Sequence, residues 1–247
     1  RRVIPYTHVR EADVTYYKRV WRIIDLKEKM NHPLYYPLVP IKEIGYERNS
    51  LFEVIKSAIQ AGEMTAYDED GVGGQFQIPL SKSEAIGKLS KEITTTDIDP
   101  ETGLEIESTY NDEITADKVK EYRLKEDWFF DKERSVMKVR IIGMLPVVEI
   151  LNTETGLSRK EGLFWIYFPE ARYVFANHEV YNPSNDGSRL TFEDLFRKRV
   201  FSGFIYKETN VYDNRITDDY TKGIDRLIEA RKIQNDIVNF EHDMWEY

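Results

Sequence analysis

The 247-residue sequence contains no cysteine, which excludes disulfides, thiolate metal sites and cysteine nucleophiles. It is also short of positive charge, with 35 basic against 44 acidic residues and a net charge of −9. Nucleic acids and anionic membranes bind basic surfaces, so the charge argues against both as partners. We expect the one basic run, residues 197–199, to be a solvated helix end. No apolar run approaches the roughly 20 residues of a membrane span.

Motifs for catalysis or metal binding are equally scarce. The four histidines lie far apart, and no nucleophile motif of a serine hydrolase is present. The glycines of 68–74 lack the Lys-Ser/Thr pair of a phosphate loop. Asp97, Asp99 and Glu101 have the spacing of calcium ligands, but Ser108 stands where a bidentate Glu is required. We therefore expect no catalytic residue, no cofactor and no metal site.

The most apolar stretch, residues 127–181, is expected to organise the fold. Met137, Val139 and Ile141 are expected on one face and Lys138, Arg140 and Ile142 on the other, which indicates a strand with one buried face. Residues 163–168 are apolar at every position, which indicates a strand buried on both faces. A turn former and a glycine between them, in 152–156, predict that the two strands pair as a long antiparallel hairpin.

The other predicted elements surround this hairpin. Val14, Tyr17, Trp21 and Ile24 recur at helical spacing, which predicts a helix over 12–29. Further helices are expected at 50–61, 81–91, 115–124 and 191–199, hairpins at 65–80 and 92–110, and a short strand at 172–176. These patterns predict an α+β fold with an antiparallel sheet centred on 134–176, an extended N-terminal arm and a C-terminal helix.

Three parts are expected along the chain. Residues 1–40 would form the arm, a helix and a proline-rich segment, 41–211 the α+β body, and 212–247 a C-terminal helical segment. Within the body, Trp128 and Trp165 are predicted to be core residues, since aromatic side chains in apolar strands bury large areas. Because the chain opens at Arg1 without Met, we expect that an N-terminal segment, for which a secretory signal is one candidate, has been removed.

Apolar side chains near the chain ends are candidates for contacts with other proteins. Residues 31–40, here called the proline strap, contain three prolines and are expected to run extended, packed on their own domain or on a neighbour. The terminal helix of 217–247 carries a broken apolar stripe, which again needs its own domain or another subunit. The predicted protein-interface residues are Tyr35, Tyr36, Leu38, Ile237, Met244 and Trp245, and the arm Arg1–Arg10 is expected to contribute.

Three aromatic-rich blocks, residues 17–37, 126–143 and 163–172, resemble the gliding-motility protein family GldN, also called PorN. The resemblance implies a non-enzymatic structural subunit of the type IX protein secretion system, located in the periplasm and peripherally associated with the outer membrane. It also implies self-association in a ring, an outer-membrane lipoprotein partner of the GldK/PorK kind, and contact with the periplasmic part of a GldM/PorM motor protein. Residues 65–115 carry no such resemblance.

Two other classes of function remain open from the residues alone. A carboxylate-dependent periplasmic hydrolase would need a concave site with two acids in different environments, and 44 acidic residues always permit some such pair. A monomeric ligand-binding module would use the aromatic patches as a pocket. Both would stay near the monomer mass of 29.2 kDa, whereas a ring subunit forms large species.

Overall fold

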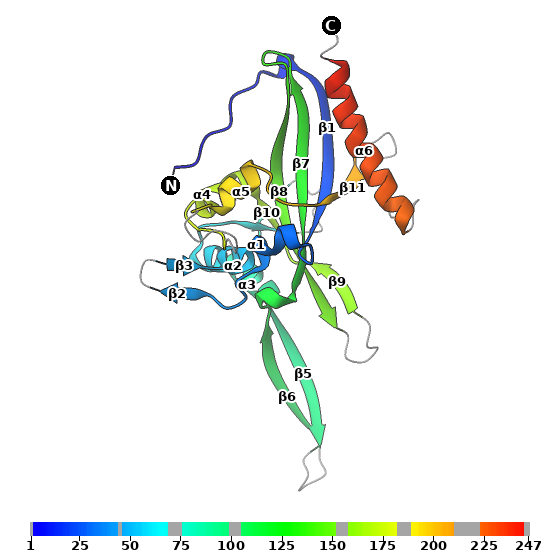
Figure 1. Ribbon diagram of the computed structural model, residues 1–247. Helices are drawn as coiled ribbons and strands as arrows, with labels where there is room; N and C mark the ends of the chain where they lie inside the picture. The colour runs from blue at the N-terminus through cyan, green and yellow to red at the C-terminus, as the bar shows by residue number, and fades with distance from the viewer. Residues whose placement is uncertain are drawn as a thin grey trace.

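The computed structural model describes residues 2–43, 46–68, 76–98, 105–151, 158–181, 189–209 and 223–244. Its centre is a seven-stranded antiparallel sheet with strand order β11-β1-β7-β8-β10-β4, in which β9 also pairs with β8 (Figure 1). The strands are β1 (Val14–Asp25), β4 (Ala66–Tyr67), β7 (Val119–Asp131), β8 (Val136–Leu151), β9 (Ser158–Gly162), β10 (Trp165–Tyr167) and β11 (Phe204–Glu208). The predicted α+β class with an antiparallel sheet is confirmed.

Six helices and two small sheets complete the described residues. The helices are α1 (His32–Tyr35), α2 (Leu51–Ala61), α3 (Lys82–Leu89), α4 (Phe168–Phe175), α5 (Phe192–Arg197) and α6 (Ile224–Asp243). The small sheets pair β2 (Ile41–Glu43) with β3 (Tyr46–Arg48), and β5 (Ser90–Ile98) with β6 (Glu105–Glu113). In Figure 1, α4 and α5 lie on one side of the long strands, α6 lies beside β1 and β11, and the β5–β6 ribbon projects away from the body.

The long hairpin at the centre of the sheet is formed by β7 and β8. Their register runs from Val119 opposite Val148 to Asp131 opposite Val136. The strand expected from residue 136 onward is confirmed, but its predicted pairing is only partly right. Strand β10 meets β8 at only two register positions, Ile166 opposite Met144 and Tyr167 opposite Gly143. Strand β7 pairs with one edge of β8. On the other edge β9 pairs with β8 from Val147 opposite Gly162 to Leu151 opposite Ser158, so the second arm of the predicted hairpin is divided between β9 and the three-residue β10.

The predicted helix over 12–29 is wrong, because most of this segment is strand β1. It lies between β11 and β7, with Trp21 opposite Lys125. Residues Val20 to Ile24 are all buried, since both faces of the strand are covered there. Burial on two faces removes the alternation that identifies a strand, and the remaining apolar spacing imitates a helix. The β-branched and aromatic residues of β1 are nevertheless typical of strands.

Two further predictions are also wrong. The segment 115–124 begins with a single 3-10 turn, Ala116–Lys118, and then enters β7 rather than continuing as a helix. Residues 172–176, predicted as a strand, belong mainly to α4. Pro169 lies in the first turn of α4, where its missing N–H costs no helical hydrogen bond, so it starts this helix as readily as it ends a strand.

Helices with clear capping residues agree with prediction. Ser50 Oγ accepts a hydrogen bond from Glu53 N at 3.3 Å at the start of α2, and Gly62 ends the helix with φ of 80°. Ser81 and Glu84 form a reciprocal capping box on α3, and Thr191 caps α5. These side chains satisfy backbone donors that the first helical turn leaves unpaired.

The two smaller predicted hairpins lie partly outside the described residues. Tyr67 bridges Pro79 in antiparallel fashion, as expected for 65–80, while the glycine-rich tip is not described. Strands β5 and β6 confirm the hairpin of 92–110. Its turn, with Asp99 and Glu101 of the weak calcium pattern, lies outside the described residues.

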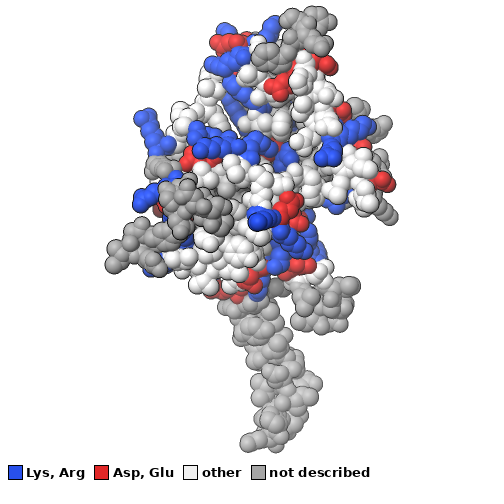
Figure 2. Space-filling model, viewed as in Figure 1, with Lys and Arg blue, Asp and Glu red and all other residues white. Residues whose placement is uncertain are grey.

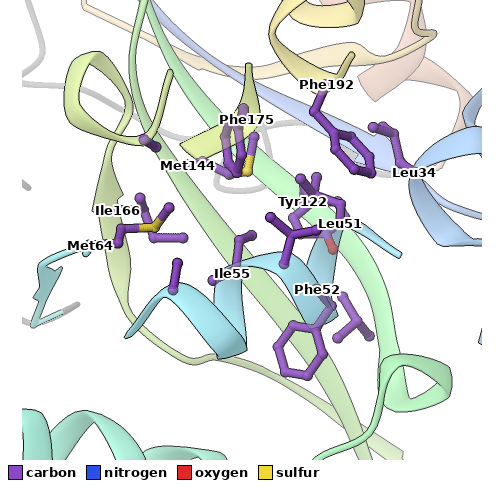
Figure 3. Packing of buried hydrophobic residues seen from close by; sticks show 14 of the residues in the cluster. Leu34, Leu51, Phe52, Ile55, Met64, Tyr122, Met144, Ile166, Phe175 and Phe192 are labelled. Atoms are coloured by element: carbon purple, nitrogen blue, oxygen red, sulfur yellow. The ribbon is translucent and has the colours of Figure 1, made fainter. Parts of the chain in front are cut away.

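The main core fills the space between α2 and the sheet. Leu51 and Ile55 of α2 face Tyr122 of β7, Met144 of β8 and Ile166 of β10 (Figure 3). A second cluster on the other face of the sheet contains Trp21, Leu145 and Trp165. Trp165 is buried, so its predicted core position is confirmed. Trp128 is only half-buried and lines a cavity, which differs from the expectation.

Candidate interaction surfaces

The described residues contain no group of three or more His, Asp or Glu side chains placed to hold a metal ion. Of the histidines, His178 is half-buried, and this burial lowers its pKa. Figure 2 shows positive and negative side chains interspersed over the face viewed, with uncharged surface between them. The candidate sites for binding other proteins are therefore the apolar surfaces that are exposed to solvent.

The proline strap is anchored at its start by Asn31, which is fully buried. Its Nδ2 donates to the carbonyl oxygens of Asp25 and Ser202 at 2.7 and 3.0 Å, and its Oδ1 accepts from Ser202 N at 2.8 Å. The expected extended conformation is wrong for residues 32–35, which form α1. Pro33 lies in the first turn of this helix, where no N–H is required, and the burial of Leu34 holds the helix on the body.

The predicted interface residues of the strap differ in exposure: one packs on the body of its own chain and two face solvent. The half-buried Tyr35 packs against the main core and donates its hydroxyl to Asp117 O at 3.4 Å. Tyr36 and Leu38 remain 39% and 37% exposed. The ring of Tyr36 meets those of His32 and Tyr35 edge-on, at centroid distances of 5.6 and 5.0 Å. The Tyr36 ring therefore has a defined orientation on the surface.

A largely apolar groove of about 560 Å³ lies along the strap. It is called the strap groove here, and its walls are His32, Tyr36, Pro37, Leu38, Val39, Ile41 and Tyr181. A concave apolar surface with aromatic walls is the kind of place where a partner's anchor side chain binds. The structure thus brings Tyr36 and Leu38 into one groove, together with Tyr181 from a distant part of the sequence.

Helix α6 docks on its own chain through a narrow contact. Ala230, Ile233 and Ile237 are buried, and Ile233 and Ile237 pack against Val20 and Ile205. The ring of Phe240 stacks on Tyr16 at a centroid distance of 4.2 Å, and Glu241 Oε1 accepts from Met137 N at 3.2 Å. These contacts fix the C-terminal half of α6 beside the sheet.

The predicted interface residues of this region therefore differ in accessibility. Ile237 is 1% exposed and is used inside the chain, whereas Met244 is 37% exposed at the helix end. Trp245 lies outside the described residues. Ile237 is therefore not accessible to a partner, and a contact between α6 and another protein has to use other residues of the helix.

The first turn of α6 supplies such positions. Ile224, Leu227 and Ile228 are 76%, 53% and 60% exposed, and we call these three residues the α6 tip. They are spaced by three and four residues and so share one face of the helix. They are not among the interface residues predicted from the sequence. Their helical spacing can be read from the sequence. Only the packing of Ile233 and Ile237 against the sheet shows that these three apolar side chains remain exposed to solvent.

The N-terminal arm contacts its own body rather than standing free. Arg172 Nη2 donates to Ile4 O and Arg140 Nη2 donates to Thr7 O, both at 2.6 Å. The Arg172 guanidinium lies 4.1 Å from the ring centroid of Tyr6. Burial raises the pKa of Tyr6, although the nearby Arg172 and Arg140 act in the opposite direction. The described part of the arm, like α6, therefore has an intramolecular docking site.

The β5–β6 ribbon is a further element that projects from the body (Figure 1). Its nine-residue strands pair with each other from Ser90 opposite Glu113 to Ile98 opposite Glu105, and they belong to no larger sheet among the described residues. A two-stranded ribbon is only marginally stable alone in water. Its projection from the body makes it a further surface on which another protein can pack (Figure 1).

Comparison with known proteins identifies the family of the chain. None of the helices in the described part of the chain combines the length and apolar character that a membrane-spanning helix needs. No curated protein matches the chain. The model of the family described as gliding motility associated protein GldN matches residues 9–246. Since this match covers nearly the whole sequence, the chain belongs to the GldN family of gliding motility associated proteins.

Proposed function

We propose that the chain is a non-enzymatic structural subunit of the type IX protein secretion and gliding machinery. In this proposal it lies in the periplasm, peripherally associated with the outer membrane, and self-associates in a ring. Its partners are a GldK/PorK-like outer-membrane lipoprotein and the periplasmic domain of a GldM/PorM-like motor protein. Membership of a gliding motility family supports the proposal that the chain belongs to this machinery. The exposed apolar surfaces support the proposal that it acts by assembling with other subunits.

The observation that carries the assembly role is the separation of two apolar surfaces on one chain. The strap groove is lined by residues of α1, β2 and the segment between them, whereas the α6 tip is exposed on the first turn of α6. Helix α6 and strand β2 lie on opposite sides of the long strands (Figure 1). A subunit that joins unlike surfaces of neighbouring copies forms a ring when the rotation closes. The aromatic and proline residues of the groove lose little conformational entropy on binding.

The strap groove can be tested with the double substitution Tyr36→Ala and Leu38→Ala. Both side chains are partly exposed, so the variant should keep the melting temperature of the unmodified protein within a few degrees. Its assemblies with the lipoprotein should be lost on size-exclusion chromatography with mass measurement, leaving species near 29.2 kDa. Tyr173→Ala is the matched control, because Tyr173 is a largely exposed aromatic residue on α4, away from the groove.

The α6 tip is tested separately with Leu227→Ser and Ile228→Ser together. Val238→Ser, at an exposed position further along the same helix, is the control. Loss of assembly in the tip variant alone would assign the tip to a subunit contact. If both surface variants still form large complexes with the lipoprotein and support secretion in cells, the proposal that these surfaces assemble the ring is wrong.

A further inference from the structure

A buried ion cluster lies between the sheet and α5. Glu126 of β7 is fully buried, and its Oε2 accepts from Arg22 Nε of β1 at 3.3 Å. Its Oε1 accepts from Arg199 Nη2 at 2.9 Å. One carboxylate thus faces two guanidinium groups. A single guanidinium would neutralise Glu126, so the cluster carries one surplus positive charge, and the side chain of Arg199, which is 30% exposed, brings that charge to the surface of the cluster.

Arg199 has a backbone conformation that usually favours glycine, which indicates that its side chain is kept for the contact with Glu126. Arg199 follows the end of α5 with φ of 54°, in the left-handed region, and the turn is closed by Val200 N donating to Leu195 O at 3.0 Å. Glycine is the usual residue at this position after a helix, since it has no Cβ to strain. The guanidinium lies 5.4 Å from the ring centroid of Trp128 and 5.1 Å from that of Phe201.

This arrangement corrects one expectation from the sequence. The run 197–199 was expected to be a solvated helix end, which holds for Arg197 and Lys198. Arg199 instead turns inward to Glu126. Nothing in the run separates the third basic residue from the first two, because the partner lies 73 residues away along the chain.

A cavity of about 310 Å³ opens beside the cluster. Its walls include Arg22, Met30, Trp128, Arg199, Phe201 and Gln234, the last from α6. Arg22 is nine-tenths buried, and its Nη1 donates to Gly203 O at 2.8 Å. Burial lowers the pKa of Arg22, Glu126 raises it, and the positive charge of Arg199 lowers it further. The surplus charge therefore faces a space large enough for a small ligand.

We propose that this cavity binds a carboxylate, supplied by a small organic acid or by an acidic side chain of another protein. A monoanion matches the single surplus charge, whereas a phosphate dianion would exceed it. Guanidinium groups hold carboxylates through paired charge-assisted hydrogen bonds. Because Gln234 belongs to α6, the occupant would contact both α6 and the sheet. This inference goes beyond the proposed function and does not depend on it.

The test titrates the full chain with sodium butyrate, a monocarboxylate, and, separately, with a blocked tripeptide containing one glutamate. Binding is followed by calorimetry and by tryptophan fluorescence, since Trp128 lines the cavity. We expect saturable binding of at least one probe, with an increase in melting temperature. Tighter binding of butyrate would assign a free acid as the source, and tighter binding of the peptide would assign an acidic side chain.

Two variants, each with a matched control, test whether the carboxylate binds in this cavity. Arg199→Gln should weaken binding at least about tenfold, while Lys198→Gln, an equal charge change at the exposed neighbour, should leave it unchanged. Gln234→Leu should also weaken binding, although it leaves the ion cluster unchanged. Its control is Asn235→Leu, at an exposed position of α6, which should leave binding unchanged. The Gln234 pair tests the site if the Arg199→Gln variant does not fold. Absence of binding for both probes, or equal affinity in each variant and its control, would overturn the proposal.

Discussion

Both ends of strand β7 carry charged side chains, but they are packed differently: the start lies in the main core and is called the apolar end here, and the part from Glu126 onward is called the charged end. Towards its start, Val119, Tyr122 and Leu124 are buried in the main core beneath the helices. Beyond Lys125 the same strand carries Glu126 and a series of ion-paired acids, and this end is covered on one face by α6. One continuous strand thus belongs to two regions with different chemistry.

The difference indicates how stability is distributed. Apolar burial in a large cluster is cooperative, and it gives most of the free energy of folding. Ion pairs lose solvation when they form, so they contribute specificity of arrangement more than net stability. Helix α6 rests on a cluster of only four buried apolar side chains, Val20, Ile205, Ile233 and Ile237. We therefore expect the apolar end to unfold as one unit and α6 to open separately at lower cost.

The largest effect is expected from Phe175→Ala, on α4 in the main core that covers the apolar end. Phe175 is fully buried, with ring centroids of Phe168, Phe192 and Phe196 at 5.9, 6.3 and 6.1 Å. Truncation should lower the free energy of unfolding by about 3–5 kcal/mol, measured by urea denaturation. Tyr173→Ala, on the exposed side of the same helix, should change it by less than about 0.5 kcal/mol. Equal effects of the two would refute the cooperative core.

A smaller and local effect is expected from Ile237→Ala in α6. Ile237 is buried in the small cluster, and its truncation should cost about 2 kcal/mol. The loss should be seen as faster amide hydrogen exchange in α6, with little change in the main urea transition. Val238→Ala, at the neighbouring exposed position, should leave exchange unchanged. A main transition displaced as far as in Phe175→Ala would show instead that α6 unfolds with the core.

The smallest effect is expected from Asp131→Asn at the charged end, and it depends on pH. Hydrogen bonds from Lys138 at 2.6 Å and Arg134 at 2.9 Å lower the pKa of Asp131 to about 2, against burial, which raises it. A lowered folded-state pKa contributes stability above the unfolded pKa of about 3.8, and this stability is lost as pH falls towards 2. The difference in unfolding free energy between the unmodified protein and the variant should therefore shrink over this range.

Glu133→Gln serves as the control for this pH series, since Glu133 is more than half exposed and adjoins the same Arg134. Its effect on stability should be small at every pH, as is usual for a surface ion pair. A constant difference between Asp131→Asn and the unmodified protein from pH 5 to pH 2 would mean that the ion pairs of the charged end do not act through Asp131.

Elements that depend on neighbouring residues were predicted correctly. Ser50 and Gly62 bracket α2, and Thr191 starts α5, because caps act on backbone groups within a few residues. The hairpin β5–β6 follows from alternation around a local turn. The strap was partly predictable in the same way. Tyr36 and Leu38 are partly exposed, and their predicted interface role stays a prediction, whereas the short helix before them was not predicted.

Elements whose neighbours are distant in sequence were predicted poorly. Val14, Tyr17, Trp21 and Ile24 match a helical stripe, and only the strands on both sides of β1 decide that they lie in a sheet. Likewise, nothing local distinguishes Ile237, which docks inside the chain, from Leu227, which remains outside. The cluster of Arg22, Glu126 and Arg199 joins residues 104 and 73 positions apart.

The amino-acid sequence alone therefore determined the α+β class, the capped helices, the absence of thiol chemistry and the resemblance to the GldN family. All of these follow from composition, from local hydrogen bonding or from long blocks of similar residues. Tertiary structure decided the strand identity of β1, the pairing of β8 with β7, the α6 tip and the cavity beside Glu126. Each of these is set by strand pairing and side-chain burial between distant segments, and those contacts leave no periodic pattern in either segment.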